Sequence, residues 1–229
     1  KKLDDKQYIA YEILCCSFIL ELVESGELEG EFEVDSRDER KVRNNKARLI
    51  RNLEARLAKR NLTMFLTGPA GSGKSTAVDV AQRYCYEVSL ALNIIWDNSF
   101  LFTSTTGSSA ALFGGITIHT AAGLMTKMEN IGDEHMARFK HVRLLIVDEI
   151  SYFSKKDVRN LDMRLKKIRG RSDLPFGGLP IVFCGDFHQL LPVNCKSDHV
   201  LYSNAKGDNY WEQIISTIVV LENKHRFKD

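Results

Sequence analysis

The spacing of hydrophobic residues divides the chain into an N-terminal helical part and a longer part in which short strands alternate with helices. Between residues 3 and 23 the hydrophobic side chains recur at helical spacing, and Asp4 is placed to cap the resulting helix. Residues 44–60 carry leucines at every fourth position, which predicts a second amphipathic helix. The stretch between them, 24–41, is rich in acids and glycine, so we expect an exposed loop or insertion there.

From residue 62 onward the hydrophobic pattern is that of an α/β protein. Short, mainly apolar runs occur at 62–67, 100–103, 144–148 and 180–184. Amphipathic helical stretches lie between them. Continuous apolar runs indicate strands buried on both faces, which is typical of a parallel sheet. We therefore predict an α/β fold with a mainly parallel sheet flanked by helices, preceded by a helical extension. In such sheets ligands bind beyond the carboxyl ends of the strands.

Composition narrows the class of protein further. The chain has 229 residues, 44% hydrophobic and 27% charged, which is sufficient for one large domain or two small ones. The net charge of +2 does not by itself indicate a nucleic-acid partner, although residues 21–39 are mostly acidic and 41–60 strongly basic. The apolar run at 13–20 is too short for a membrane span and is wrongly flanked for a signal peptide. We expect a soluble, intracellular protein with no membrane partner.

The cysteines suggest thiols rather than disulfides or a metal centre. There are five of them, an odd number, with no CxxC pair, so reduced thiols in a reducing compartment are the simplest interpretation. Cys184, His188, Cys195 and His199 fall close together and raise the possibility of zinc. The paired spacing that makes such a site specific is missing, and we expect no structural zinc.

A glycine-rich segment directly after the first predicted strand matches the phosphate-binding P-loop at every fixed position. The sequence Gly-Pro-Ala-Gly-Ser-Gly-Lys-Ser at 68–75 allows backbone N–H groups to curl around phosphate oxygens at a helix N-terminus. Lys74 is expected to reach the β- and γ-phosphates, and the Ser75 hydroxyl to bind Mg²⁺. The predicted nucleotide-binding residues here are Gly68, Pro69, Ala70, Gly71, Ser72, Gly73, Lys74, Ser75 and Thr76. The alternative is a glycine-rich turn without a ligand.

The apolar run 144–148 supplies the expected partner of the P-loop. It ends in Asp148, which is placed to hold Mg²⁺, and Glu149 follows, suited to orient or deprotonate an attacking water. Alone, this pattern is a strand with two acids at its exposed end. Together with the P-loop it predicts hydrolysis of a nucleoside triphosphate, without indicating what the hydrolysis drives.

Further segments resemble, in order along the chain, motifs of the petite integration frequency (PIF) helicases. They are Gly107 with Ala110 and 114–119 (a DNA-contacting motif), 148–151 (the second motif), 175–178 with 184–193 (the third), and Trp211, Leu221 and Arg226 (the start of the next). The resemblance runs from residue 3 to residue 229, except for 24–60. The layout is similar to that of helicases carried by Helitron-type transposons.

The resemblance implies a RecA-like motor domain of an ATP-dependent 5′-to-3′ DNA helicase of superfamily 1B, which translocates on single-stranded DNA and unwinds duplexes. It implies that Gln189 senses the γ-phosphate, that Arg226 is an arginine finger, and that Gln7 reads adenine. The implied contacts to the single-strand backbone are Thr106, Gly107, Thr117 and His119. Two alternatives stay open: Gln7 completes a capping box with Asp4, and His119 only caps or packs the helix that follows.

The resemblance also implies how the chain is organised. Residues 1–61 form a helical segment with the glutamine motif and a charged insertion, 62–221 the first motor domain, and 222–229 the start of a linker. A second RecA-like domain of the same parent chain would follow, so weak hydrolysis and no unwinding are expected of this fragment alone. The expected location is the nucleus or mitochondrion of a eukaryote, or otherwise the cytoplasm. Two interpretations of the basic helix in 44–60 stay open. It contacts DNA phosphates or a neighbouring domain, or its basic face is exposed to solvent without a partner.

Some positions depart from the family pattern. Thr105 stands where proline is expected, Ser108 and Ser109 stand where Ile-Ala is usual, and Phe227 replaces a glutamine. These departures concern the details of DNA contact.

Two other classes of function remain as alternatives. A P-loop ATPase acting on a protein assembly or a small molecule would keep Lys74 and Asp148, but would not need the segments 185–189 and 117–119. A noncatalytic module with a vestigial pocket is disfavoured by the intact P-loop and paired acids. Binding of single-stranded DNA separates the first hypothesis from the others.

Overall fold

The computed structural model describes residues 2–28, 39–57, 61–94, 99–189, 200–203 and 207–223, with the backbone alone for 39–45. The helices are α1 Asp5–Glu24, α3 Glu39–Glu54, α4 Lys74–Ala91, α5 Gly107–Leu112, α6 Ile118–Ala121, α7 Asp133–Lys140, α8 Lys155–Arg169 and α9 Tyr210–Ile214. The strands are β1 Thr63–Thr67, β2 Phe100–Ser104, β3 Ile116–Thr117, β4 Leu144–Asp148, β5 Ile181–Gly185 and β6 Thr217–Val220. Short 3-10 turns lie at Met128–Asn130, Ile150–Tyr152 and Pro175–Gly178.

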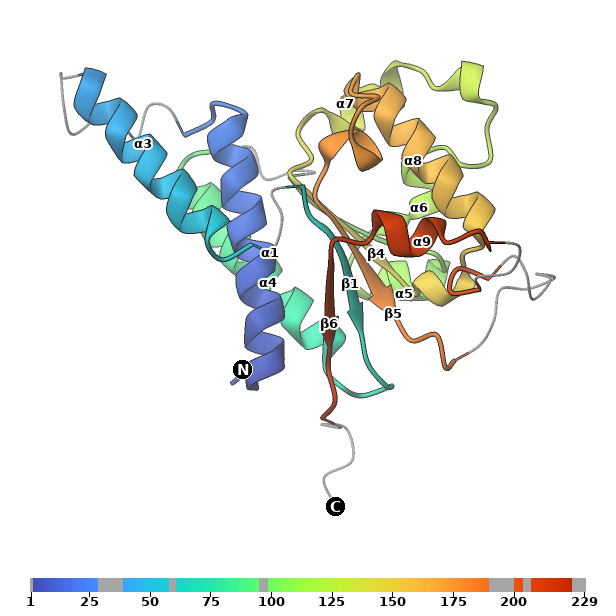
Figure 1. The fold of residues 1–229 in the computed structure, drawn as a ribbon. Coiled ribbons are helices and arrows are strands. Elements are labelled where there is room, and N and C mark those ends of the chain that lie inside the picture. Colours follow the sequence, from blue (N-terminus) through green and yellow to red (C-terminus); the bar gives the residue numbers. More distant parts are fainter. Residues whose placement is uncertain are drawn as a thin grey trace.

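All six strands form one parallel sheet in the order β3-β2-β4-β5-β1-β6 (Figure 1). The predicted α/β fold with a mainly parallel sheet is therefore confirmed. The register places Thr67 beside Gly185 and Ser104 beside Asp148, so β1, β5, β4 and β2 end at one edge of the sheet. The P-loop and the paired acids both emerge at this edge, as the rule for ligand sites in parallel sheets requires.

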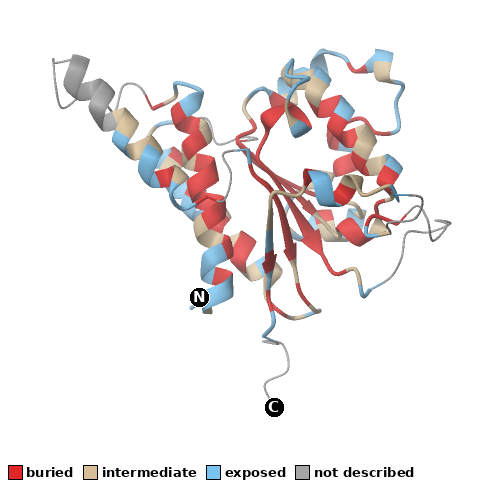
Figure 2. Cartoon of the chain, viewed as in Figure 1, coloured by how far each residue is buried: buried red, intermediate tan, exposed pale blue. Residues whose placement is uncertain are grey.

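The strands are mainly apolar because helices cover both faces of the sheet. Met64 and Leu66 belong to a core shared with α1, α3 and α4, whereas Phe65 between them belongs to a core shared with α6 and α8. Alternate side chains of a strand point to opposite faces, so one short run supplies both cores. Burial is accordingly concentrated in the strands and in the helix faces turned toward them (Figure 2).

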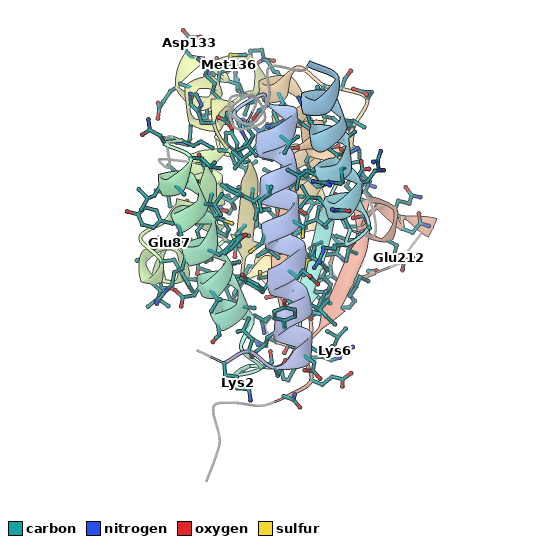
Figure 3. The ribbon with its side chains drawn as sticks, turned by 90° about the vertical axis from the view of Figure 1, so that its left-hand side faces the viewer. Lys2, Lys6, Glu87, Asp133, Met136 and Glu212 are labelled. Carbon is teal, nitrogen blue, oxygen red and sulfur yellow. The ribbon has the colours of Figure 1, made fainter. Side chains whose placement is uncertain are left out.

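The N-terminal helix α1 packs into the main core. Ala10, Leu14, Phe18 and Leu22, spaced by four residues, are all fully buried and pack with α4 and the sheet. Figure 3 shows α1 between α4 and α3. Removing α1 would uncover the core that it shares with α4 and the sheet. Burial of a side chain of this size contributes roughly 1.5–3 kcal/mol to stability.

Ion pairs fasten the C-terminal part of α1 and the following turn. Arg143 donates from Nε and Nη2 to the two carboxylate oxygens of Glu27 at 2.9 and 3.0 Å. Arg169 of α8 lies 3.3 Å from Glu21. Burial raises the pKa of Glu21, and the Arg169 charge acts in the opposite direction.

The second predicted helix differs in its bounds. α3 runs from Glu39 to Glu54 instead of 44–60, because the last turns tighten: Arg56 and Leu57 donate to carbonyls three residues back. Leu53 and Leu57 still pack on α1, as their spacing predicts. Most of the predicted loop at 24–41 lies outside the described residues. Among the described residues, no helix has the length and apolar character needed to cross a membrane.

Candidate nucleotide-binding site

A hollow of about 770 Å³ opens at the carboxyl edge of the sheet. Its lining comes from the ends of four strands: Ala70, Gly71, Gly73, Lys74, Ser75 and Thr76 after β1; Thr106, Ser108, Ser109, Leu112 and Phe113 after β2; Asp148, Glu149 and Tyr152 after β4; and Gly185, Asp186 and Gln189 after β5. Segments up to about 120 residues apart in sequence thus meet at one place, because neighbouring parallel strands end together.

The P-loop backbone requires glycine at two positions. Gly68 has φ +149°, and a Cβ there would meet the Leu221 carbonyl oxygen at 2.3 Å. Gly73, with φ 87°, is the N-cap of α4, and no side chain caps this helix. The loop therefore passes close under the end of β6 and leads into a helix N-terminus open toward the hollow. Such a terminus favours phosphate through its N–H groups and dipole.

Lys74 lies over the loop that precedes it. Its Nζ donates to the carbonyl oxygens of Gly68 at 2.6 Å and Pro69 at 3.3 Å. An ammonium has three donors, so this arrangement leaves one for a phosphate oxygen while the loop holds the side chain in place.

The paired acids at the end of β4 differ in environment. Burial raises the pKa of Glu149, and the negative charges of Asp148 and Asp186 add to this, while Lys74 opposes it. Glu149 also has a left-handed backbone, with φ 57° and ψ 40°. A carboxylate with a raised pKa is a stronger base, which suits proton abstraction from water.

The oxygen donors present fit Mg²⁺. Ser75 and Asp148 offer a hydroxyl and a carboxylate on the same hollow, and Mg²⁺ is usually held by one or two such groups together with phosphate oxygens and water. In the described ranges, no group of three or more His, Cys, Asp or Glu side chains is arranged to hold a metal ion. Cys195 and His199, two of the candidate zinc residues, lie outside those ranges.

Asp186, after β5, is a third acid that sequence analysis missed. It is 8% exposed and accepts hydrogen bonds from the His188 N–H at 2.9 Å and from Gln189 Nε2 at 3.3 Å. Burial alone would raise the pKa of Asp186, but these bonds outweigh it and the net shift is downward. Asp186 thereby holds the Gln189 amide at the hollow. The signal was available, because an acid directly after a buried strand is the same pattern that identified Asp148.

Gln7 connects the cap of α1 to the P-loop. Its Oε1 accepts from the Asp4 N–H at 3.1 Å and its N–H donates to the Asp4 carboxylate at 2.8 Å, so the capping box is confirmed. Its Nε2 also donates to the Ser72 carbonyl oxygen at 3.1 Å. Asp4 in turn accepts from Asn223 Nδ2 at 3.1 Å. Contact of Gln7 with adenine remains a prediction.

The predicted DNA contacts lie at the ends of the neighbouring strands β2 and β3. Thr106 caps α5 and accepts from the Ser109 N–H at 3.4 Å, and Gly107 begins α5 with open space around it. Thr117 caps α6 and accepts from the Thr120 N–H at 3.3 Å. Their hydroxyls therefore have a capping role already, which leaves their contact with DNA a prediction.

The two remaining predicted site residues are His119 and the arginine finger Arg226. The His119 ring packs edge-on against Phe153, with ring centroids 5.3 Å apart, so its packing alternative is present in the structure. Arg226 and the departure at Phe227 lie outside the described residues. Ser109, treated above only as a departure from the family pattern, donates from Oγ to Asp148 Oδ2 at 2.8 Å.

Comparison with known proteins identifies the family. Residues 41–229 match the model described as PIF1-like helicase, and the chain belongs to that family. It is 31% identical over 180 residues to the ATP-dependent DNA helicase PIF1 of Saccharomyces cerevisiae, a match covering 75% of this chain and 20% of that protein. The chain thus spans about a fifth of the yeast relative's length.

Crystal structures of Bacteroides Pif1 have the same fold. The structure in complex with ADP-AlF4 is similar with a TM-score of 0.57 and 27% identity, over 74% of this chain and 40% of that one. The structure bound to ssDNA gives a TM-score of 0.56 and 27% identity, over 73% of this chain and 40% of that one. These neighbours agree with the RecA-like fold predicted from the sequence.

Proposed function

We propose that the chain is the first motor domain of an ATP-dependent DNA helicase that moves 5′-to-3′ along single-stranded DNA and unwinds duplexes. The observation that carries this is the single hollow in which the P-loop, the acids of β4 and the glutamine after β5 converge. Family membership adds support, since the yeast relative is named an ATP-dependent DNA helicase.

The P-loop, the acids of β4 and the glutamine after β5 have distinct roles in ATP hydrolysis. The P-loop N–H groups and Lys74 bind the phosphates, and Ser75 and Asp148 hold Mg²⁺, which when bound neutralises charge on the β- and γ-phosphates. Glu149 orients the attacking water and takes its proton. Gln189, held by Asp186, reaches the γ-phosphate. Gln7 reads adenine, and Arg226 completes the site when a second RecA-like domain of the parent chain docks.

Single-stranded DNA is the proposed partner of the surface beside the hollow. Thr106 and Gly107 follow β2, and Thr117 and His119 follow β3, its neighbour in the sheet. Hydroxyls and backbone N–H groups bind phosphates without reading bases, so binding is expected to be independent of sequence. A Bacteroides relative has been crystallised with ssDNA. We expect the protein to work inside the cell, in the nucleus or mitochondrion of a eukaryote and otherwise in the cytoplasm.

Fluorescence anisotropy with an oligothymidine at two salt concentrations tests the proposal. We expect weak binding that falls as salt rises, with a shallow slope because few phosphates are contacted. The double variant Thr117→Ala with His119→Ala should weaken binding and leave nucleotide affinity unchanged. His141→Ala, at the opposite edge of the sheet before β4, is the matched control and should bind normally.

The outcomes separate the candidate functions. Unchanged binding by the double variant would place the DNA path elsewhere, with the exposed Arg48 and Arg51 of α3 as the next candidates. Failure of the folded, ATP-binding chain to bind DNA at any salt would favour an ATPase that acts on a protein or a small molecule.

A further inference from the structure

The segment after β2 is hydrogen-bonded to the two acids after β4 through groups outside the sheet ladder. Ser109 Oγ donates to Asp148 Oδ2 at 2.8 Å. The Thr105 N–H donates to the Asp148 carbonyl oxygen at 3.0 Å, and Thr105 Oγ1 to the Glu149 carbonyl oxygen at 2.7 Å. The two acids are therefore held by residues of another strand end, about forty positions earlier in the chain.

The bond from Ser109 acts directly on the carboxylate expected to hold Mg²⁺. A hydroxyl donating to a carboxylate is a charge-assisted bond, roughly twice as strong as a neutral one. It fixes the rotation of the carboxyl group by engaging Oδ2. Within the described part of the chain, Oδ1 accepts no hydrogen bond, which leaves that oxygen available to a cation or its water.

The bond from Thr105 acts on the backbone of the neighbouring acid. Glu149 is one of three non-glycine residues with positive φ among the described residues. A left-handed conformation is unfavourable for a residue with a Cβ and persists only where surrounding contacts hold it. The Thr105 hydroxyl, bonded to the Glu149 carbonyl oxygen, is such a contact.

These bonds depend on the chemical groups of residues 105 and 109. Proline at position 105 would lack both the N–H and the hydroxyl that Thr105 uses. Alanine at position 109 would lack the hydroxyl that reaches Asp148. The departures Thr105 and Ser109 therefore add contacts at the acids.

We propose that Ser109 is a positioning residue for Asp148 and that it couples the DNA-facing helix α5 to the metal-binding carboxylate. α5 begins at Gly107, a proposed DNA contact, and two residues later presents Ser109 to Asp148. When α5 shifts on binding DNA, the Ser109 side chain shifts the Asp148 carboxylate with it, and the sheet does not have to move. The coupling rests on the proposed function, whereas the positioning of Asp148 does not.

The first test measures how much Mg²⁺ strengthens nucleotide binding. A fluorescent ADP analogue is titrated against the 229-residue chain in Mg²⁺ and in EDTA. The dissociation constant in EDTA is divided by the dissociation constant in Mg²⁺, and this ratio is compared between variants. Ser109→Ala should lower this ratio about tenfold, since a hydrogen bond to a charged group is worth roughly an order of magnitude in an equilibrium constant. Affinity in EDTA should not change.

Two variants make this test specific. Ser108→Ala removes an exposed hydroxyl of the same helix and hollow and should leave the ratio unchanged. Ser109→Thr keeps a hydroxyl and should restore it. An unaltered ratio in Ser109→Ala, even with a lowered melting temperature, would show a purely structural role and overturn the positioning of Asp148.

The second test repeats the titrations with saturating oligothymidine. DNA should change the Mg²⁺-dependent ratio of the unaltered chain and leave that of Ser109→Ala unchanged. The same response in both proteins would overturn the coupling. Failure of the unaltered chain to bind oligothymidine would remove the proposed function and the coupling with it, while the first test would still decide the positioning role.

Discussion

Replacing Gln7 by alanine tests how the N-terminal helix supports the P-loop. Gln7 is 3% exposed, and its side chain makes two hydrogen bonds, to the Asp4 N–H and to the Ser72 carbonyl oxygen. Each is worth about 0.5–1.5 kcal/mol net, so Gln7→Ala should lower the free energy of unfolding by about 1–3 kcal/mol. Urea unfolding measures this change. An unchanged slope of the free energy of unfolding against urea concentration would show that the folded and unfolded states keep their compactness.

A matched variant separates the cap from the P-loop contact. Asp4→Ala removes the carboxylate that caps α1 and accepts from Asn223, but it keeps the bond from Gln7 to Ser72. Loss of the cap should cost about 1 kcal/mol. Gln7→Glu keeps the acceptor for the Asp4 N–H but places an acceptor against the Ser72 carbonyl oxygen. It should therefore destabilise the chain by more than loss of the cap alone.

Nucleotide preference then decides the role of Gln7 in adenine recognition. If Gln7 contacts the base, both Gln7 variants should lose the preference for ATP over GTP, while Asp4→Ala retains it. Equal discrimination in all the proteins would refute the adenine contact. A loss of stability in Gln7→Ala no greater than in Asp4→Ala would refute a contribution from the Ser72 bond.

Three further predictions follow from the site and the core. Lys74→Ala should abolish Mg²⁺-dependent binding of an ATP analogue, because the phosphates lose their main cationic partner; equal affinity in both proteins would contradict the site. Hydrogen bonds from Arg143 lower the pKa of Glu27, although burial opposes this shift. The Glu27 carboxylate therefore contributes stability at neutral pH, and this contribution is lost as the pH falls through the lowered pKa. Glu27→Gln should lower the free energy of unfolding by about 1 kcal/mol at pH 7. In unfolding experiments at acid pH, the difference in stability between this variant and the unaltered chain should disappear. Burial and the acidic neighbours Asp148 and Asp186 raise the pKa of Glu149. The rate of ATP hydrolysis should therefore begin to fall at a pH above the ordinary pKa of glutamate, and Glu149→Gln should be inactive at every pH.

The sequence predicted those parts of the fold that depend on local pattern. The segments 62–67 and 144–148 are mainly apolar runs of five or six residues, and the structure has β1 and β4 there. The two residues of β3 are too few to give such a pattern. β6, at 217–220, was overlooked, although it is as long as the predicted run at 100–103. Sequence spacing also identified α1 as a helix, but a helix with apolar residues on most of its surface does not reveal what it packs against.

The candidate site divides in the same way. Lys74 and Asp148 were found because phosphate binding and metal binding demand particular residues at fixed spacing beside a strand. The bond from Ser109 to Asp148 was not, because it joins residues 39 positions apart whose proximity follows only from the order of strands in the sheet. Asp186 stood in a recognisable position and was overlooked.

The close approach of Gly68 to the Leu221 carbonyl oxygen gives the phosphate loop a mechanical connection to both of its flanks. The segment that leaves β6 passes directly over the loop at Gly68, and two residues later Asn223 is bonded to Asp4 at the start of α1. A load applied before Asp4 or after Asn223 therefore reaches the phosphate-binding backbone within one or two contacts.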